Sequence, residues 1–196
     1  MILDSAQKRR SRYQLTPELP ISDDKLIELV QESVKMAPSA FNSQSTRVVI
    51  LLKEKHHTFW QIARSELQKI VPAEKFGPTE EKLKSFENAY GTILFFEEWK
   101  TVEALQNQFP TYKDNFPLWA YQANAMAEFI IWTALAEQGI GASLQHYNPL
   151  VDARVKETFN LPASWKLIAQ MPFGVSVGVD APKTFLPIKE RVKVLD

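Results

Sequence analysis

The sequence has no cysteine and no excess of charge of either sign, and both absences restrict its function. Without cysteine, the chain cannot form a disulfide framework, a thiol nucleophile or a thiolate metal site. Its 23 basic and 23 acidic residues give a formal net charge of zero. This balance argues against nucleic acid as the main partner, because phosphate binding depends on excess lysine and arginine. A glycine-rich phosphate loop is also missing.

Linkers, repeats and low-complexity runs are missing as well. No Ser/Gly-rich segment or block of like charge divides the chain. We therefore expect one domain over residues 1–196, a length that can bury a substantial core without disulfides. The N-terminal residues contain no apolar core of the kind found in signal peptides, which predicts a cytoplasmic protein.

Helical and strand-like segments alternate along the chain, which predicts an α+β or three-layer fold rather than a regular βαβ repeat. The expected helices lie at 4–12, 23–37, 53–71, 79–90, 117–138 and 151–161, and the expected strands near 47–52, 91–96, 142–146, 165–178 and 188–194. Pro172 to Gly174 is expected to interrupt the fourth strand. Ser22 is a suitable N-cap for the helix that follows it.

The longest predicted helix starts at Pro117 and ends at Gly139, a residue suited to a C-terminal cap. Its side chains are apolar nearly all round, so the helix needs burial on more than one face. It is either a central helix inside a large monomer, or it packs on the sheet with one face and on a partner subunit with the other. Polar residues within it, such as Asn124 and Glu128, argue against a membrane span.

Two polar segments are candidates for binding. Residues 4–12 carry four basic side chains and form either a solvated, frayed terminus or an anion site, since arginine forks and a serine hydroxyl match phosphate. Residues 38–47 form a polar loop between a helix and an apolar strand, where binding groups are usually found. Its side chains could contact a heterocycle, or they could satisfy their own backbone as a capped turn.

Three further features have more than one interpretation. The aromatic stretch 98–116 is either a mobile flap over a flat ligand or a surface helix and loop. Adjacent His56 and His57 point about 100° apart on a helix and cannot chelate together, so we expect surface histidines. Alternation in 188–195 places Lys189, Arg191 and Lys193 on one side of a strand, which by itself indicates a solvated edge.

Taken together, these segments resemble the FMN-dependent nitroreductases. The resemblance rests on Arg-Arg-Ser at 9–11, Pro-Ser-x-x-Asn-Ser-Gln at 38–44, a long helix ending in Gly-x-Gly at 139–141, Pro-x-Gly at 172–174 and Lys-x-Arg at 189–191. It covers essentially the whole chain. The sequences of residues 40–44, 142–149 and 190–193 are similar to those of a compact subgroup that includes fungal fatty-acid-repression proteins and bacterial copper-induced nitroreductases.

The resemblance implies a three-layer sandwich with a mixed, mainly antiparallel sheet flanked by helices, and a long central helix at a homodimer interface where two FMN molecules bind. It assigns the FMN phosphate to one set of residues and the ribityl chain and flavin ring to another. The phosphate set is Arg9, Arg10, Ser11, Lys189 and Arg191. The second set is Ser39, Asn42, Gln44, Leu144, Gln145 and His146.

The implied activity is ping-pong hydride transfer from NADH or NADPH, through flavin N5, to a nitroaromatic or quinone-like acceptor, with no catalytic side chain and no metal. Arg12 or Arg47 could compensate the charge of the reduced flavin, and His146 is either a structural residue or an acid. Departures at Ser45-Thr46, Arg12-Tyr13 and Gln145-His146 affect the ring contacts rather than the phosphate end. The alternatives are a flavin- or lipid-responsive regulatory protein without turnover, and a partner-binding module without cofactor.

Overall fold

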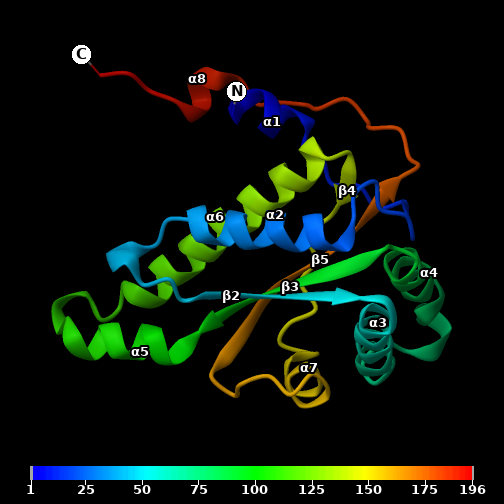
Figure 1. Cartoon of the computed structure of the whole chain (residues 1–196), viewed down its shortest axis with the longest axis horizontal. Helices are drawn as coiled ribbons and strands as arrows, with labels where there is room; N and C mark the ends of the chain where they lie inside the picture. Colours follow the sequence, from blue (N-terminus) through cyan, green and yellow to red (C-terminus); the bar gives the residue numbers. More distant parts are fainter. Residues whose placement is uncertain (1, 196) are drawn as a thin grey trace.

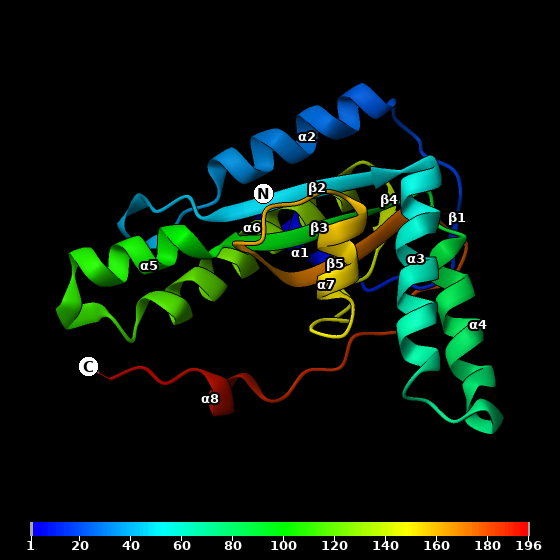
Figure 2. The same cartoon turned by 90° about the horizontal axis from the view of Figure 1, so that it is seen from below.

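The computed structural model describes residues 2–195 and confirms the expected α+β fold with three layers (Figures 1 and 2). The sheet has the order β1-β5-β3-β2, with β4 also paired to β5, and every pair of named strands is antiparallel. One isolated parallel bridge joins Ser11 to Ala142. The strands are β1 (Leu15–Thr16), β2 (Thr46–Leu52), β3 (Gly91–Glu98), β4 (Ile140–Ala142) and β5 (Trp165–Ser176).

Helices cover both faces of this sheet. They are α1 (Ile2–Lys8), α2 (Asp23–Met36), α3 (Lys53–Gln68), α4 (Phe76–Glu87), α5 (Trp99–Gln108), α6 (Phe116–Glu137), α7 (Asp152–Thr158) and α8 (Ile188–Arg191), with short 3₁₀ turns η1 (Ala40–Asn42), η2 (Ala73–Lys75) and η3 (Pro110–Tyr112). None of the helices in residues 2–195 combines the length and apolar character needed to cross a membrane.

Alternate side chains of the central strand β3 feed two separate cores, because successive residues of a strand point to opposite faces. Ile93 and Phe95 pack with α2 and α6, whereas Leu94 and Phe96 pack with α3, α4 and α7. All four are fully buried. Burial on both faces accounts for the uninterrupted apolar run in this strand.

Two helix boundaries follow the sequence signals. The Ser22 hydroxyl accepts a hydrogen bond from the backbone N–H of Lys25 at 3.3 Å, which confirms the predicted N-cap of α2. Gly139 follows α6 with a φ of 74°, a left-handed conformation that glycine adopts without strain. The cap directs the chain from the end of α6 straight into β4.

Several predicted boundaries were wrong. The strand expected at 142–146 is β4, which ends at Ala142, and beyond it Gln145 forms only an isolated bridge with Gln170. Pro172 does not interrupt β5, since the strand is continuous through Ser176. Helix α4 begins at Phe76, ahead of Pro78, because proline is tolerated in a first helical turn.

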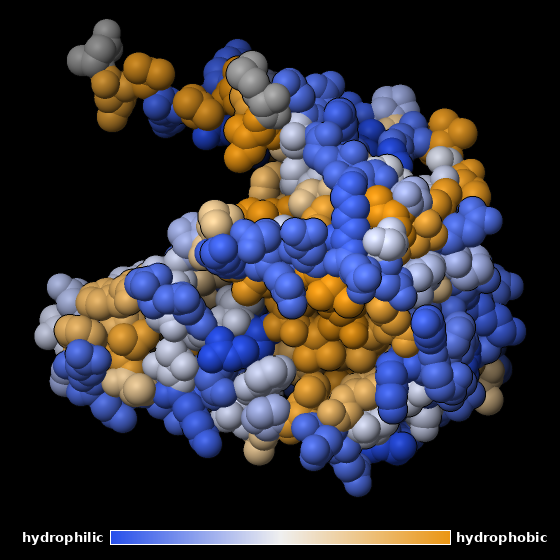
Figure 3. All heavy atoms as spheres, viewed as in Figure 1, coloured by the Kyte–Doolittle hydropathy of each residue, from blue (hydrophilic) through white to orange (hydrophobic). Residues whose placement is uncertain are grey.

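The predicted C-terminal strand is absent from the described residues. Residues 188–191 form the single helical turn α8 after Pro187, and the chain beyond it is irregular. The tail from 184 to 195 is exposed throughout and projects away from the body of the molecule (Figures 1 and 3). Alternation of residue types alone does not make a strand when no neighbouring strand edge is available to pair with.

His56 is buried, so the prediction of two surface histidines is wrong for this residue and correct only for the exposed His57. The Nε2 of His56 lies 3.1 Å from the Glu87 carbonyl and its Nδ1 lies 2.9 Å from the Thr92 hydroxyl, which also accepts from Trp60 Nε1 at 2.9 Å. A carbonyl can only accept, so Nε2 carries the hydrogen. The Thr92 hydroxyl then donates to Nδ1, and the imidazole is neutral.

Acidification is therefore expected to destabilise the protein through His56. Burial is the main cause that lowers the pKa of His56 to about 4 from 6.5. Because the folded state binds this proton more weakly than the unfolded state, stability holds above the unfolded pKa and falls as pH drops through the folded one. The full loss is about 3 kcal/mol.

Urea denaturation at pH values from above the unfolded pKa of 6.5 to below the folded pKa of about 4 measures this loss of stability. The variant His56→Gln is expected to lose much less stability on acidification, whereas His57→Gln should behave as the wild type. Equal pH profiles for the wild type and His56→Gln would contradict the assignment.

Candidate functional site

The basic segment that follows α1, residues 9–12, is held against the C-terminal part of α6. The backbone N–H of Arg12 donates to the Ala142 carbonyl at 2.9 Å, and Ser11 bridges the same residue of β4. The guanidinium of Arg9 lies 4.3 Å from the ring centroid of Trp132. Burial, and to a lesser extent the charge of Arg10, lowers the pKa of Arg9. The segment is therefore an ordered part of the fold rather than a frayed terminus.

Part of this segment anchors the C-terminal tail. Arg12 donates to both carboxylate oxygens of Asp180, at 3.1 and 2.7 Å, and this bonding lowers the pKa of Asp180. Arg10 Nη2 donates to the Ala181 carbonyl at 2.5 Å, and Lys183 Nζ donates to the Gln7 carbonyl at 3.1 Å. Arg12 is thus committed to a structural ion pair, whereas most donors of Arg10 have no partner among residues 2–195.

Lys189 and Arg191 lie beyond this anchor, in α8, and both side chains are exposed. No hydrogen bond or ion pair joins them to Arg9 or Ser11 within residues 2–195. The phosphate-binding set predicted from sequence is therefore only partly assembled, with its N-terminal members in place and its C-terminal pair on the projecting tail.

The segment 144–146 passes beside the same end of α6. Leu144 packs with the core that contains Trp132. Gln145 exchanges backbone hydrogen bonds with Gln170 at 2.7 and 2.9 Å and is buried, and its Nε2 donates to Ser143 Oγ at 3.1 Å. His146 is exposed. Leu144 thus follows Ala142, the residue that the basic segment contacts, by two positions, while the side chain of Gln145 is turned toward the protein.

The polar loop 39–44 has an unusual backbone. Phe41, Asn42 and Gln44 all adopt positive φ, at 56°, 50° and 46°, and such left-handed residues other than glycine cluster at functional sites. The Ser39 hydroxyl accepts from the Gln44 N–H at 3.0 Å, so Ser39 satisfies its own loop as a capped turn does. The side chains of Asn42 and Gln44 are exposed.

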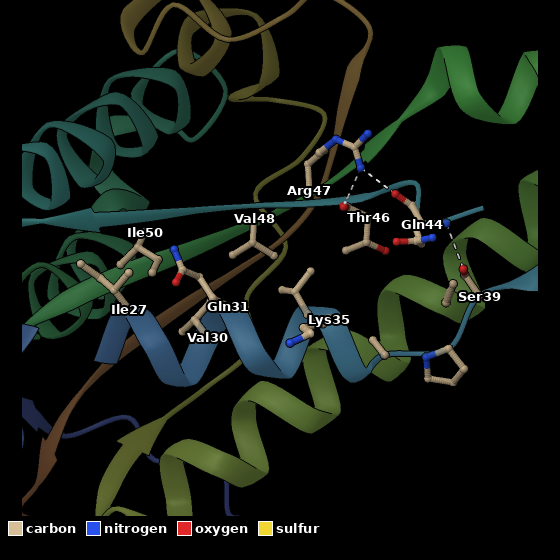
Figure 4. Close-up of a pocket in the computed structure, with 14 residues that line it drawn as sticks. Ile27, Val30, Gln31, Lys35, Ser39, Gln44, Thr46, Arg47, Val48 and Ile50 are labelled. Carbon is tan, nitrogen blue, oxygen red and sulfur yellow. Dashed lines mark hydrogen bonds between the residues drawn. The ribbon is translucent and has the colours of Figure 1, made fainter. Parts of the chain in front are cut away.

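A groove of about 670 Å³ opens beside this loop, between α2 and the edge strand β2 (Figure 4). Figure 3 shows the opening as apolar surface below α2. Its walls are mainly apolar, with Val30, Val48 and Ile50 among them. Gln31 and Lys35 lie along α2, and the other polar groups gather at one end. There Arg47 Nη1 donates to the carbonyls of Gln44 and Thr46, at 2.7 and 3.0 Å.

The two halves of the predicted site contact opposite ends of α6. Phe41 of the loop stacks on Trp119, with ring centroids 6.0 Å apart, whereas Arg9 covers Trp132. Thirteen residues separate these tryptophans, or about 20 Å along a helix. One chain therefore presents the loop and the basic segment as two separate surfaces.

The aromatic stretch 98–116 is a surface helix and turn, α5 followed by η3. Its rings gather around Phe41, whose centroid lies 4.8 Å from that of Phe109 and 6.1 Å from that of Tyr112. Sequence analysis did not connect this stretch with the loop 39–44. The one aromatic residue of the polar loop, Phe41, and the aromatic side chains of 98–116 are the signal that could have suggested it.

Comparison with known proteins gives the same fold over the whole chain. The model of the Nitroreductase family matches residues 6–175. The nitroreductase FRM2 of Saccharomyces cerevisiae is 34% identical over 190 residues, covering 94% of this chain and 92% of FRM2.

Among solved structures, nitroreductase CinD from Lactococcus lactis, in complex with chloramphenicol, is 40% identical with a TM-score of 0.92. CinD in complex with 4-nitrophenol is 41% identical with a TM-score of 0.91, and both alignments cover 100% of each chain. A Desulfovibrio desulfuricans structure solved with FMN shares the fold alone, at 17% identity and a TM-score of 0.73, over 100% of this chain and 96% of that one. The family match and the coverage together show that this chain belongs to the nitroreductase family of oxidoreductases.

Proposed function

We propose that residues 1–196 form one FMN-binding domain that transfers a hydride from NADH or NADPH to nitroaromatic or quinone-like acceptors. The observation that carries the proposal is the ordered donor set Arg9, Arg10 and Ser11, held beside β4 and Trp132. Forked guanidinium donors with a hydroxyl suit a phosphate that carries two negative charges. CinD, which is similar over its whole length, binds the nitroaromatics chloramphenicol and 4-nitrophenol.

The residues present fit a flavin phosphate. Arg10 uses one donor on Ala181 and keeps the others, Ser11 is exposed, and the buried Nε1 of Trp132 has no hydrogen-bond partner within residues 2–195. An unpaired donor beside Arg9 favours an anionic or acceptor-rich ligand. Bound FMN would supply the hydride-transfer chemistry, while this chain binds and orients it.

A second copy of the chain would bring the two separated surfaces to one flavin. The N-terminal segment and Leu144 of one copy would hold the phosphate and the ring edge, and Ser39, Asn42 and Gln44 of the other would contact the ribityl chain and ring. Exposed apolar side chains on α6, among them Leu118, Met126 and Phe129, support such a homodimer. The apolar tail, with Phe185 and Leu195 exposed, is a second surface that a partner would cover.

In this proposal, Arg47 compensates the negative charge that the reduced flavin carries near its N1–C2 carbonyl. Arg12 is bonded to Asp180 through two of its nitrogens, whereas Arg47 lines the groove and uses only Nη1 on backbone carbonyls. A guanidinium at that position stabilises the negative charge that gathers there on reduction.

The purified protein is expected to be yellow, to bleach when NADH is added without oxygen, and to recover its absorbance when a nitroaromatic follows. Visible absorption spectroscopy measures all three steps. A colourless protein that excess FMN does not restore would contradict the proposal. A yellow protein that neither NADH nor NADPH bleaches would favour the alternative, a flavin- or lipid-responsive regulatory protein.

A further inference from the structure

A cluster of polar side chains is buried between β3 and α6, directly behind the wall of the groove. Glu97 and Asn124 are both fully buried. The Oε1 of Glu97 accepts from the Thr46 hydroxyl at 2.7 Å and from Asn124 Nδ2 at 2.8 Å, and Asn124 also donates to the Phe96 carbonyl at 3.0 Å. Thr46 itself lines the groove.

Two oxygens of this cluster lack a donor. Neither Glu97 Oε2 nor Asn124 Oδ1 has a hydrogen-bond partner within residues 2–195, although both atoms are buried. Buried acceptors are normally bonded, because an unpaired one retains the cost of leaving water. The cluster therefore needs an additional hydrogen.

Glu128 is placed to supply that hydrogen. It lies one helical turn beyond Asn124, on the same face of α6, and only 7% of it is exposed. Burial, and then the charge of Glu97, raises its pKa to about 7. A protonated carboxyl is a donor, which an ionised one is not.

Several other charged groups on the elements packed around α6 have partners of their own. Arg47 donates to the Gln44 and Thr46 carbonyls, Glu98 accepts from Trp165 Nε1, and Lys166 donates to Tyr121 Oη. Lys8 pairs with Glu137, Arg9 lies over the Trp132 ring, and Lys35 pairs with Glu32. No cation among these groups is bonded to Glu97 or Glu128.

We propose that Glu97 and Glu128 share one proton behind the groove wall, and that this proton keeps Glu97 in position to hold Thr46 and the loop 39–44. The bonds at the base of that loop include Thr46 to Glu97, the Glu98 N–H to the Ser45 carbonyl at 2.8 Å, and Arg47 to Gln44. Loss of the proton places two carboxylates in one buried cluster, where they repel. Glu97 and Glu128 are positioning residues, and only the flavin consequence rests on the proposed function.

Difference infrared spectroscopy of the protein as isolated tests the shared proton directly. We expect the C=O stretch of a protonated, buried carboxyl to titrate near neutral pH, to disappear in Glu128→Gln, and to titrate at lower pH in Glu97→Gln, because that change removes the neighbouring negative charge. Glu103→Gln, at an exposed position of α5, is the matched control and should leave the band unchanged. A band that survives Glu128→Gln, or one whose titration is the same in Glu97→Gln as in the wild type, overturns the proposal. So does the absence of any band, and stability that then depends on sodium or potassium would indicate a cation in the cluster instead.

Flavin binding tests the consequence for the loop. Between about pH 6 and about pH 8, the dissociation constant for FMN is expected to rise by about fivefold or more, the lower end of usual coupling between two sites. Glu128→Gln, which remains neutral, should remove this pH dependence, and Glu103→Gln should preserve it. A pH dependence that persists in Glu128→Gln overturns the link to the loop. If the protein takes up no FMN at any pH, the proposed function fails, while the infrared result still decides whether the proton is shared.

Discussion

Replacing Gly174 with alanine is expected to cost about 3 kcal/mol of folding free energy, the upper end for overpacking in a core. A Cβ at this position would lie 2.3 Å from the Thr16 carbonyl oxygen and 3.1 Å from the Tyr90 backbone nitrogen. Both neighbours are backbone atoms held in the sheet, since Thr16 pairs with Val175 and Tyr90 N–H donates to the Phe173 carbonyl at 2.9 Å. Neither can yield without breaking a strand pairing.

Urea denaturation of Gly174→Ala and of Gly77→Ala compares a crowded glycine with an open one. A Cβ at Gly77, in the first turn of α4, meets no atom within 4 Å, so that variant should be neutral or slightly more stable. If Gly174→Ala keeps nearly wild-type stability, β1 does not approach β5 as closely as described.

Combined substitution of Arg9 and Arg191 with alanine is expected to abolish FMN retention. In the proposed site, each change would remove forked donors from a doubly charged phosphate, and charge-assisted hydrogen bonds of this kind are stronger than neutral ones. Arg9 is fixed against Trp132, whereas Arg191 is exposed on the tail. We therefore expect the single change at Arg9 to weaken binding more than the single change at Arg191.

Flavin content after gel filtration, and the dissociation constant from quenching of FMN fluorescence, measure this loss. Arg154→Ala is the matched control, because Arg154 is half exposed and pairs with Glu66 on the other side of the sheet. Unchanged flavin content in the double variant would count against the phosphate assignment, while loss in Arg154→Ala would indicate general destabilisation.

Local signals made most of the fold predictable. Six of the helices and the central strands were expected from the sequence pattern, whereas α5 was left open and α8 was predicted as a strand. The Ser22 cap and Gly139 marked helix ends correctly because caps are local chemistry. The burial of His56 was also visible in principle. It lies three, four and seven positions before the buried residues Phe59, Trp60 and Ala63, on one helical face.

The site was harder to predict from the sequence than the fold, because its contacts join segments that are distant in the chain. Motifs identified the basic segment and the loop 39–44. No local sequence pattern indicates that Arg12 pairs with Asp180, which is 168 positions away, or that Glu97 bonds to Thr46 and Asn124. The sheet register and the approach of α6 decide these contacts. The prediction of a C-terminal strand was wrong for a related reason. Alternation of residue types in this segment indicated a strand without showing which strand edge it would pair with.

The anchor at residues 180–183 also gives the tail a defined reach. Lys189 lies six residues beyond Lys183, a span of roughly 20 Å when extended, so it sweeps a small volume around the end of α1. A tethered group of this kind acts at an effective concentration in the millimolar range. Ligand capture by the tail would then depend on tether length rather than on protein concentration. Lengthening the segment between Lys183 and Lys189 should weaken capture gradually, and removing the Arg12–Asp180 pair should loosen the anchor, which then depends on the bonds of Arg10 to Ala181 and of Lys183 to Gln7.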